Sequence, residues 1–269
     1  MSISAHWPVL LLCLVAASAT AAQPLPPSEI DHMREELGVN EFTSPSIEVV
    51  LQELNALKPI PFEKVWRDSP SATPQDRASM ALSIGGVIAD GFLAVSAEKQ
   101  SRIEPVGRVL FKLAKGLGVG EHVSKHSRSI LEKAARQQWP EIKEELIRTQ
   151  AEVESAMLGL KDEELAHLIA LGGWMRALEI TAGTVVETYS PERAGRLIQP
   201  ELLDYFLDRT STLNPTLKKN PAVEVLEKNL RELKQLLEKT PDNVLELNEV
   251  KRIRDLSREV NRLIAGGES

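Results

Sequence analysis

The sequence predicts an all-α protein, organised as a multi-helix bundle, and three observations carry that prediction. Only 4% of the residues are aromatic, although β-sheets are enriched in aromatic and β-branched side chains. Capping side chains repeatedly precede proline, as in Ser190-Pro191 and Asn220-Pro221, which is typical of helix starts. Apolar residues recur every three or four positions, and no segment alternates as a half-buried strand would.

The first residues predict an exported protein. Residues 7–17 read WPVLLLCLVAA, and no Asp, Glu, Lys or Arg occurs before Glu29. This apolar run is shorter than the ~20 residues needed to span a membrane, but it fits the apolar core of a signal peptide. Ala19-Thr20-Ala21 supplies a small-x-small cleavage pattern. We expect a signal peptide over 1–21, cleaved near Ala21, and a periplasmic or secreted chain; the alternatives are an uncleaved anchor and a lipoprotein attached through Cys13.

Composition excludes several classes of function. Cys13 is the only cysteine, so its removal with the signal peptide leaves no disulfide and no cysteine-based zinc site. The net charge of −7 argues against nucleic acid as a partner, because such binding needs a basic surface. After the signal peptide, no apolar run approaches ~18 residues, so we expect no transmembrane segment in the mature chain. No cofactor is expected, and CxxCH haem attachment is ruled out.

The elements follow from their start signals and periodicity. Residues 22–74 form a proline-rich lead, with short helices at 28–38 and 45–57 and a linker at 58–74. Thr73-Pro74 predicts the start of the next helix, and Ser101 with Glu104 forms a candidate capping box. Gly116–Gly120 is expected to end a helix and form a turn rather than bind a phosphate. The longer predicted helices are 75–98, 103–117, 122–138, 141–158, 161–188, 191–209, 221–238 and 242–264.

The last two helices carry the clearest apolar stripes. In each of them, five aliphatic residues recur at intervals of three and four (Val223, Leu226, Leu230, Leu233 and Leu237, then Val250, Ile253, Leu256, Val260 and Leu263). We read 221–264 as an antiparallel helical hairpin. Periodicity leaves open whether the hairpin packs on its own domain or serves an unknown protein partner or self-association.

Two segments of the chain resemble each other. Gly85-Gly86 recurs as Gly172-Gly173, 87 residues later, and Gly107-Arg108 recurs as Gly195-Arg196, 88 residues later. Near-constant offsets in the same chain order indicate an internal duplication. The predicted architecture is therefore two related four-helix units, over 75–158 and 159–269.

The paired glycines need a physical reason, because each costs about 1 kcal/mol relative to alanine inside a helix. Gly85, Gly86, Gly172 and Gly173 are interpreted as sites where crossing helices approach closely. The alternative is that they leave room for a ligand between the units.

Two carboxylates interrupt very apolar helices. Asp90 lies in the first Gly-Gly helix and Glu179 in the second, one turn after Arg176. A buried carboxylate must be paired, so we predict the pairs Asp90–Arg108 and Glu179–Arg196. These pairs either fix helix register or, together with Arg176, form a candidate ligand-binding site in an apolar groove.

Other chemistry has weaker support. His122 and His126 are four residues apart, which suits metal binding, but HExxH is absent and a third ligand is not evident. The simpler interpretation of this pair is two partly exposed histidines near the start of a helix that bind no metal. No serine or cysteine motif for nucleophilic catalysis occurs.

These observations favour an exported, soluble, non-catalytic helical protein for interaction or scaffolding. One alternative is a small-molecule or cofactor binder, with a pocket between the two Gly-Gly helices. Another is an enzyme of unrecognised type that uses the same carboxylates. A pocket with convergent polar groups would favour the alternatives, whereas an apolar strip left bare on 221–264 would favour a protein partner.

Overall fold

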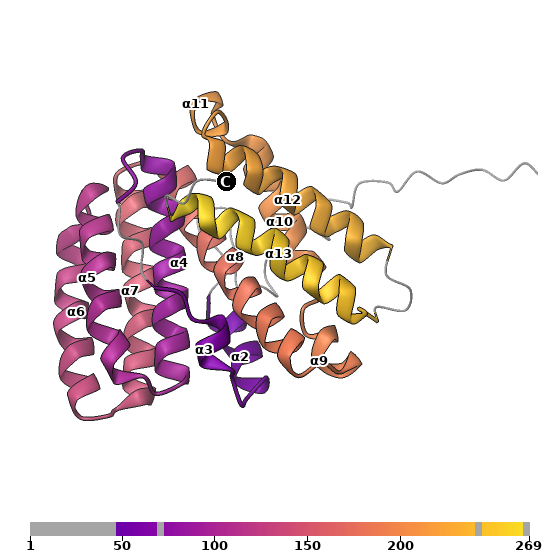
Figure 1. The fold of residues 1–269 in the computed structure, drawn as a ribbon. Coiled ribbons are helices and arrows are strands. Elements are labelled where there is room, and N and C mark those ends of the chain that lie inside the picture. The colour runs from indigo at the N-terminus through magenta and orange to yellow at the C-terminus, as the bar shows by residue number, and fades with distance from the viewer. Residues whose placement is uncertain (1–46, 69–72, 240–243, 266–269) are drawn as a thin grey trace, which may run out of the picture.

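The computed structural model describes residues 47–68, 73–239 and 244–265, and over these ranges the chain is helical without any strand. The predicted all-α class is therefore confirmed (Figure 1). The predicted signal peptide over 1–21 and the helix predicted at 28–38 lie outside the described residues.

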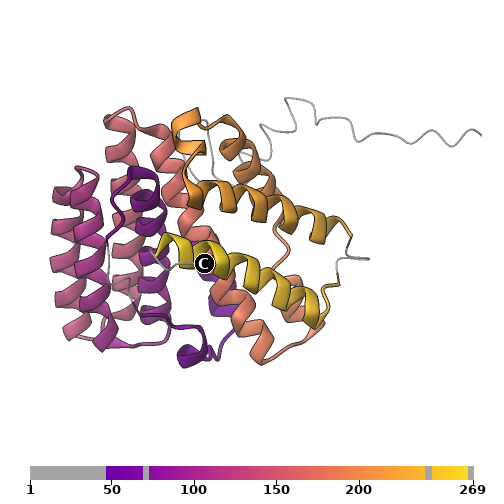
Figure 2. The same cartoon turned by 45° about the horizontal axis from the view of Figure 1, so that its top comes forward.

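Four successive helices form one bundle. They are α4 (Arg77–Ser96), α5 (Gln100–Gly116), α6 (Gly120–Ala135) and α7 (Trp139–Gly159). Each helix packs on the next, and α7 returns to pack on α4. Figures 1 and 2 both show this group side by side at one end of the molecule.

The bundle is held in register by a repeated turn. At the ends of α4, α5, α6 and α7, a backbone N–H bonds the carbonyl five residues earlier, as in Val119 N–H to Ala114 O at 2.9 Å. The residue before that donor adopts a positive φ, which is the left-handed ending of a helix. Gly118 (φ +87°) supplies it after α5, as the sequence predicted, and the other three turns use Glu98, Gln137 and Lys161.

The second half of the chain packs on the other side of α4. It contains α8 (Glu163–Glu187), α9 (Pro191–Gly195), α10 (Pro200–Thr212), α11 (Pro215–Lys218), α12 (Pro221–Glu238) and α13 (Leu247–Ile264). The central helix α8 lies along both α4 and α13, while α12 contacts α10 and α13. In Figure 2, the yellow helix α13 lies beside the golden-orange helix α12.

One helix prediction and two cap predictions are wrong. The helix predicted over 191–209 is broken into α9 and α10, because Pro200 disfavours a helical conformation at the residue before it. Asp76, not Thr73, caps α4 by accepting a hydrogen bond from Ser79 N–H, and α5 begins at Gln100 with no side-chain cap. Ser190 and Asn220 do cap α9 and α12, as predicted.

A strap of residues 57–67 crosses the surface of the helices. It follows α2 (Ile47–Ala56) and contains the single-turn helix α3 (Phe62–Val65), which lies in the predicted linker and was not predicted. Phe62 and Val65 are buried in a small apolar cluster with Leu93 and Ile180. Arg193 Nη2 also donates to Leu57 O at 2.9 Å. The strap is therefore anchored at both ends.

The crossing of α4 and α8 depends on glycine. A Cβ at Gly85 would lie 1.9 Å from Ile169 O, and a Cβ at Gly172 would lie 2.1 Å from Leu82 O. These contacts agree with the close-packing interpretation for Gly85 and Gly172, and they leave no space for a ligand between the backbones at this crossing. Gly86 instead makes room for Arg67, whose Nη2 would be 2.9 Å from a Cβ there.

The most apolar helix and the C-terminal stripes are both buried. Among the described residues, α4 has the length and composition of a membrane span. Its apolar stretch is nevertheless buried throughout by the rest of the chain, as in the core helix of a bundle. In α12 and α13, Leu226, Leu230, Ile253 and Leu256 are buried. The stripes therefore pack within the chain and are not bare strips for a partner.

Candidate functional site

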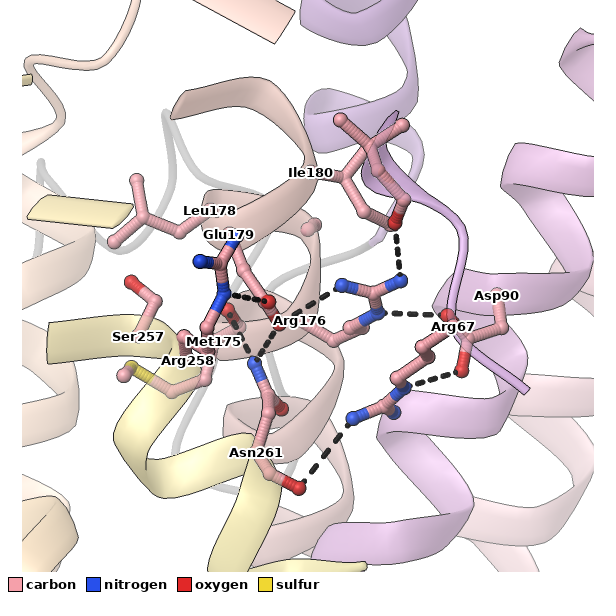
Figure 3. Close-up of polar contacts among 12 residues, drawn as sticks. Arg67, Asp90, Met175, Arg176, Leu178, Glu179, Ile180, Ser257, Arg258 and Asn261 are labelled. Atoms are coloured by element: carbon pink, nitrogen blue, oxygen red, sulfur yellow. Dashed lines mark hydrogen bonds and ion pairs between the residues drawn. The ribbon is translucent and has the colours of Figure 1, made fainter. Parts of the chain in front are cut away.

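The first candidate site is a buried ion network centred on Arg176 (Figure 3). The Arg176 side chain is 1% exposed. Its Nε donates to Asp90 Oδ1 at 2.7 Å, Nη1 to Glu179 Oε2 at 2.8 Å, and Nη2 to Val65 O at 2.7 Å. Burial would lower the pKa of Arg176, but the Asp90 and Glu179 carboxylates raise it. One guanidinium thus joins α4, α8 and the strap.

A second layer of donors surrounds the two carboxylates. Arg67 Nε donates to Asp90 Oδ2 at 2.9 Å, and Arg258 Nε donates to Glu179 Oε1 at 3.1 Å. Asn261 Nδ2 donates to Glu179 Oε2 at 2.9 Å. Each carboxylate is therefore held by two arginines, which leaves neither available as an unengaged general base.

The predicted pairs Asp90–Arg108 and Glu179–Arg196 are wrong. Arg108 lies on the exposed face of α5, beside Glu104 at 3.5 Å, and Arg196 pairs with Glu53 at 3.1 Å. Asp90, Arg176 and Glu179 do come together, but their outer partners come from segments that sequence reasoning had not linked to them. Arg67 lies in the strap, and Arg258 and Asn261 lie in the charge-rich helix α13.

A hollow opens beside this network. Its volume is about 370 Å³, and Lys64, Arg67, Arg176, Arg258 and Arg262 contribute cations to its lining. Glu179 and Asn261 also line it. We call this hollow the arginine pocket.

The second candidate site, called the apolar pocket here, lies within the α4–α7 bundle. Its volume is about 470 Å³. Its lining comes from α5 and α6, with Gly91 of α4 and two residues of α7, Leu146 and Thr149. The other apolar lining residues are Ile103, Val106, Leu110, Phe111, Ile130 and Leu131, and the polar ones from α5 and α6 are Glu104, Arg108, Ser124 and Ser127.

Two large apolar side chains in the lining are exposed to solvent. Phe111 is 39% exposed and Leu131 is 42% exposed, and both line the pocket. Gly107 also lines it, and a Cβ at Gly107 would meet nothing within 4 Å. Unlike Gly85, Gly107 is therefore not required by a close helix contact, and its lack of a side chain leaves the pocket open.

The two histidines of the metal alternative, His122 and His126, have different surroundings. His126 is buried, and its Nδ1 lies 2.6 Å from Glu145 Oε1, while its Nε2 lies 3.0 Å from Glu152 Oε2. His122 is exposed. In the ranges that the structure describes, no three His, Asp, Glu or Cys side chains are placed to hold a metal. The weak metal alternative therefore has no support there.

Glu145 is the centre of a second buried ion cluster, between α6 and α7. It accepts hydrogen bonds from Ser129 Oγ at 2.9 Å and from Lys133 Nζ, in addition to its contact with His126. Burial would raise the pKa of Glu145, but the hydrogen bonds from Lys133, His126 and Ser129 lower it to about 2. The cluster pairs Glu145 with Lys133 and joins two helices of the bundle.

No protein-family model, curated protein or solved structure matches the chain. Of the five residues predicted to bind a ligand, Arg108 lines the apolar pocket, and Arg176 and Glu179 line the arginine pocket. Asp90 and Arg196 line neither pocket. Phe111, Leu131 and Arg67 were not singled out from the sequence. Gly107 carried the available signal, because a glycine inside a helix has a cost that needs a reason.

Proposed function

We propose that the protein is an exported, non-catalytic binding protein that holds an apolar or amphiphilic small molecule in the apolar pocket. The observation that carries this proposal is the pocket itself. Its volume of about 470 Å³ falls within the ~300–1,000 Å³ typical of small-molecule sites, which are lined mainly by apolar side chains with a few polar groups. Exposed Phe111 and Leu131 in its lining give an entering ligand an apolar surface to cover.

The lining favours a hydrocarbon or aromatic body for the ligand. Ile103, Leu110 and Leu146 offer only carbon contacts. Thr149 donates its hydroxyl to Glu145 O at 2.7 Å, so that donor is already used within α7. The exposed Glu104–Arg108 pair is the nearest charged group and is suited to a polar head at the solvent edge.

The other two functions have less support. The stripes of 221–264, which would have served a protein partner or self-association, are buried in the chain's own core. An enzyme that used Asp90 or Glu179 would need a carboxylate free to exchange a proton, and both are held by arginines.

Export is part of the proposal and has its own test. The support is the apolar run at 7–17 followed by Ala19-Thr20-Ala21. N-terminal sequencing of the protein from an exporting bacterium should begin at residue 22 or 23. A chain that begins at Met1 in the cytoplasmic fraction would contradict it.

We also infer that the two halves arose by duplication. The support is that α4, α5, α6 and α7 contact in the same cyclic order as α8, α10, α12 and α13. Gly85 and Gly172, which are equivalent in the repeat, also lie at the same crossing. The binding proposal does not depend on this inference, because only the first half contains the apolar pocket.

The binding proposal is tested with a dye and one pocket-filling variant. The dye 1-anilinonaphthalene-8-sulfonate fluoresces when it binds apolar surface, and dodecanoate serves as the competitor. In Gly107→Leu the new side chain extends into open space, so it should fill the pocket while the helix gains a better helix former. We expect the wild type to bind the dye, dodecanoate to displace it, and Gly107→Leu to lose the signal.

Gly195→Leu is the matched control. Gly195 is the repeat counterpart of Gly107, also has nothing within 4 Å of its Cβ position, and lies outside the apolar pocket. It should bind the dye as the wild type does. Equal dye binding by Gly107→Leu and wild type, with the fold intact by circular dichroism, would refute the proposed site.

A further inference from the structure

The arginine pocket carries more positive than negative charge. Lys64, Arg67, Arg176, Arg258 and Arg262 supply five cations to its lining, whereas Asp68 and Glu179 supply two anions. Asp90 is a third anion next to the pocket; it does not line the pocket but forms ion pairs with Arg67 and Arg176. This excess is local, because the whole chain carries a net charge of −7.

The two carboxylates orient the arginines without using all of their donors. A guanidinium has five N–H groups. Arg67 places Nε on Asp90 and reaches Asn261 O with Nη1 at a long 3.4 Å. Arg258 places Nε on Glu179, and its Nη1 lies 4.0 Å from Asp255. Over the described ranges, no hydrogen bond is formed by Nη2 of either arginine or by the exposed Arg262 side chain.

We propose that the arginine pocket binds a small oxyanion, namely a molecule with a phosphate or carboxylate group. Arginine matches the planar, two-oxygen edge of these groups and forms paired, charge-assisted hydrogen bonds with them. Asp90 and Glu179 fix the orientation of the guanidinium groups before the anion arrives, which reduces the ordering cost of binding. A bound anion also offsets the excess of partly buried positive charge.

This site is separate from the apolar pocket. It is built from the strap, α8 and α13, whereas the apolar pocket is built from α4, α5, α6 and α7. The two proposals therefore fail independently. Gly107→Leu should leave phosphate binding unchanged. Because the dye and dodecanoate are themselves anions, the comparison uses the part of the dye signal that Gly107→Leu removes, and this part should persist in Arg258→Gln and Arg262→Gln.

The test is isothermal titration of the mature chain with inorganic phosphate and, separately, with succinate, at constant ionic strength. We expect saturable binding of at least one of them with a Kd of about 1 mM or tighter. Arg258→Gln should weaken that binding by about tenfold or more, since one charge-assisted contact is lost. Arg258→Lys should restore part of it by keeping the charge.

Two further variants separate binding from folding. Arg262→Gln removes a cation that has no ion pair in the part of the chain the structure describes, so it should weaken binding without changing the thermal midpoint. Arg252→Gln is the control on the same helix, because Arg252 pairs with Glu232 and is outside the pocket. Its affinity should equal that of the wild type.

Each outcome decides the proposal. Binding of phosphate alone identifies a phosphate-bearing ligand, binding of succinate alone identifies a carboxylate, and binding of both identifies a general oxyanion site. If neither binds more tightly than chloride, there is no such site. Equal weakening in Arg252→Gln and Arg258→Gln would show that the anion associates with surface charge rather than with the pocket.

Discussion

Replacement of Arg176 by methionine should be among the most destabilising single substitutions in the buried ion network. The change keeps a long side chain of similar shape but removes three hydrogen bonds, to Asp90, Glu179 and Val65 O. It leaves two buried carboxylates, each with one remaining arginine. Breaking a buried pair costs about 3–5 kcal/mol, which corresponds to a fall in Tm of roughly 10 °C for a domain of this size.

The control for this prediction is Arg108→Met. Arg108 is the partner that sequence reasoning assigned to Asp90, but its side chain is 72% exposed. An exposed ion pair is worth about 0–1 kcal/mol, so we expect Arg108→Met to change the free energy of unfolding by less than about 1 kcal/mol. Urea unfolding of both variants, followed by circular dichroism, makes the comparison.

A double-mutant cycle identifies the true partner of Asp90. With Asp90→Asn as the second change, the coupling energy to Arg176 should be about 1–3 kcal/mol, and the coupling to Arg108 should be within about 0.5 kcal/mol of zero. The reasoning is refuted if Arg176→Met costs less than about 1 kcal/mol, or if Asp90 couples more strongly to Arg108 than to Arg176.

Three further predictions concern packing and pH. Gly85→Ala should destabilise the protein by about 1–3 kcal/mol, because its Cβ would lie 1.9 Å from Ile169 O. Gly107→Ala should instead stabilise the protein by about 0.5–1 kcal/mol. Urea midpoints of the two variants that move in the same direction would contradict this prediction. The pKa of Glu145 is lowered from 4.5 to about 2 in the folded protein. Ionised Glu145 should therefore add on the order of 3 kcal/mol to the free energy of unfolding at neutral pH. This contribution should be lost as the pH falls from 4.5 toward 2. The stability gap between wild type and Glu145→Gln should narrow over that range, and a constant gap would be inconsistent with the ion cluster. Burial raises the pKa of Glu154 to about 7, so Glu154 should reduce stability as the pH rises from 4.5 through 7, and Glu154→Gln should raise the Tm at pH 8 but not at pH 4.

Helix positions could be predicted because they depend on local signals. The helix over 221–238 was predicted at both ends, since Asn220 and Pro221 define its start and the apolar stripe defines its length. Pro200 is itself a local signal for a helix break. The prediction missed the break because apolar residues recur with helical spacing on both sides of Pro200. Helix α3 has a single turn, which is too short for periodicity to detect.

The polar network could be predicted only in part. An ionised side chain in an apolar helix must be paired, and this argument correctly identified Asp90 and Glu179 as buried, paired carboxylates. It did not identify Arg176 as the partner that they share. It could not identify Arg67 and Arg258 as partners, because their positions depend on how the strap and α13 fold over α8. The internal repeat suggested Arg108 and Arg196 instead, and both lie on exposed surfaces.

The apolar pocket could not be predicted from periodicity. Phe111 and Leu131 recur in the sequence like core residues, and only side-chain packing determines that a space remains beside them. The alternative interpretation placed a pocket between the two Gly-Gly helices, but backbone atoms fill the crossing at Gly85 and Gly172. Gly107 entered the sequence analysis only through the internal repeat, and the cost of a helix glycine does not by itself distinguish open space from a close helix contact.

The most direct test of the proposed function is a crystal structure of the mature chain soaked with 12-bromododecanoate, with data collected at the bromine absorption edge. The bromine gives an anomalous peak that locates the end of the alkyl chain independently of how the rest of the chain is fitted to the electron density. We expect one dominant peak in the apolar pocket, between Gly107, Phe111 and Leu131, and no such peak in Gly107→Leu. A wild-type crystal with no peak there, or with the same peak in Gly107→Leu, would contradict the proposal.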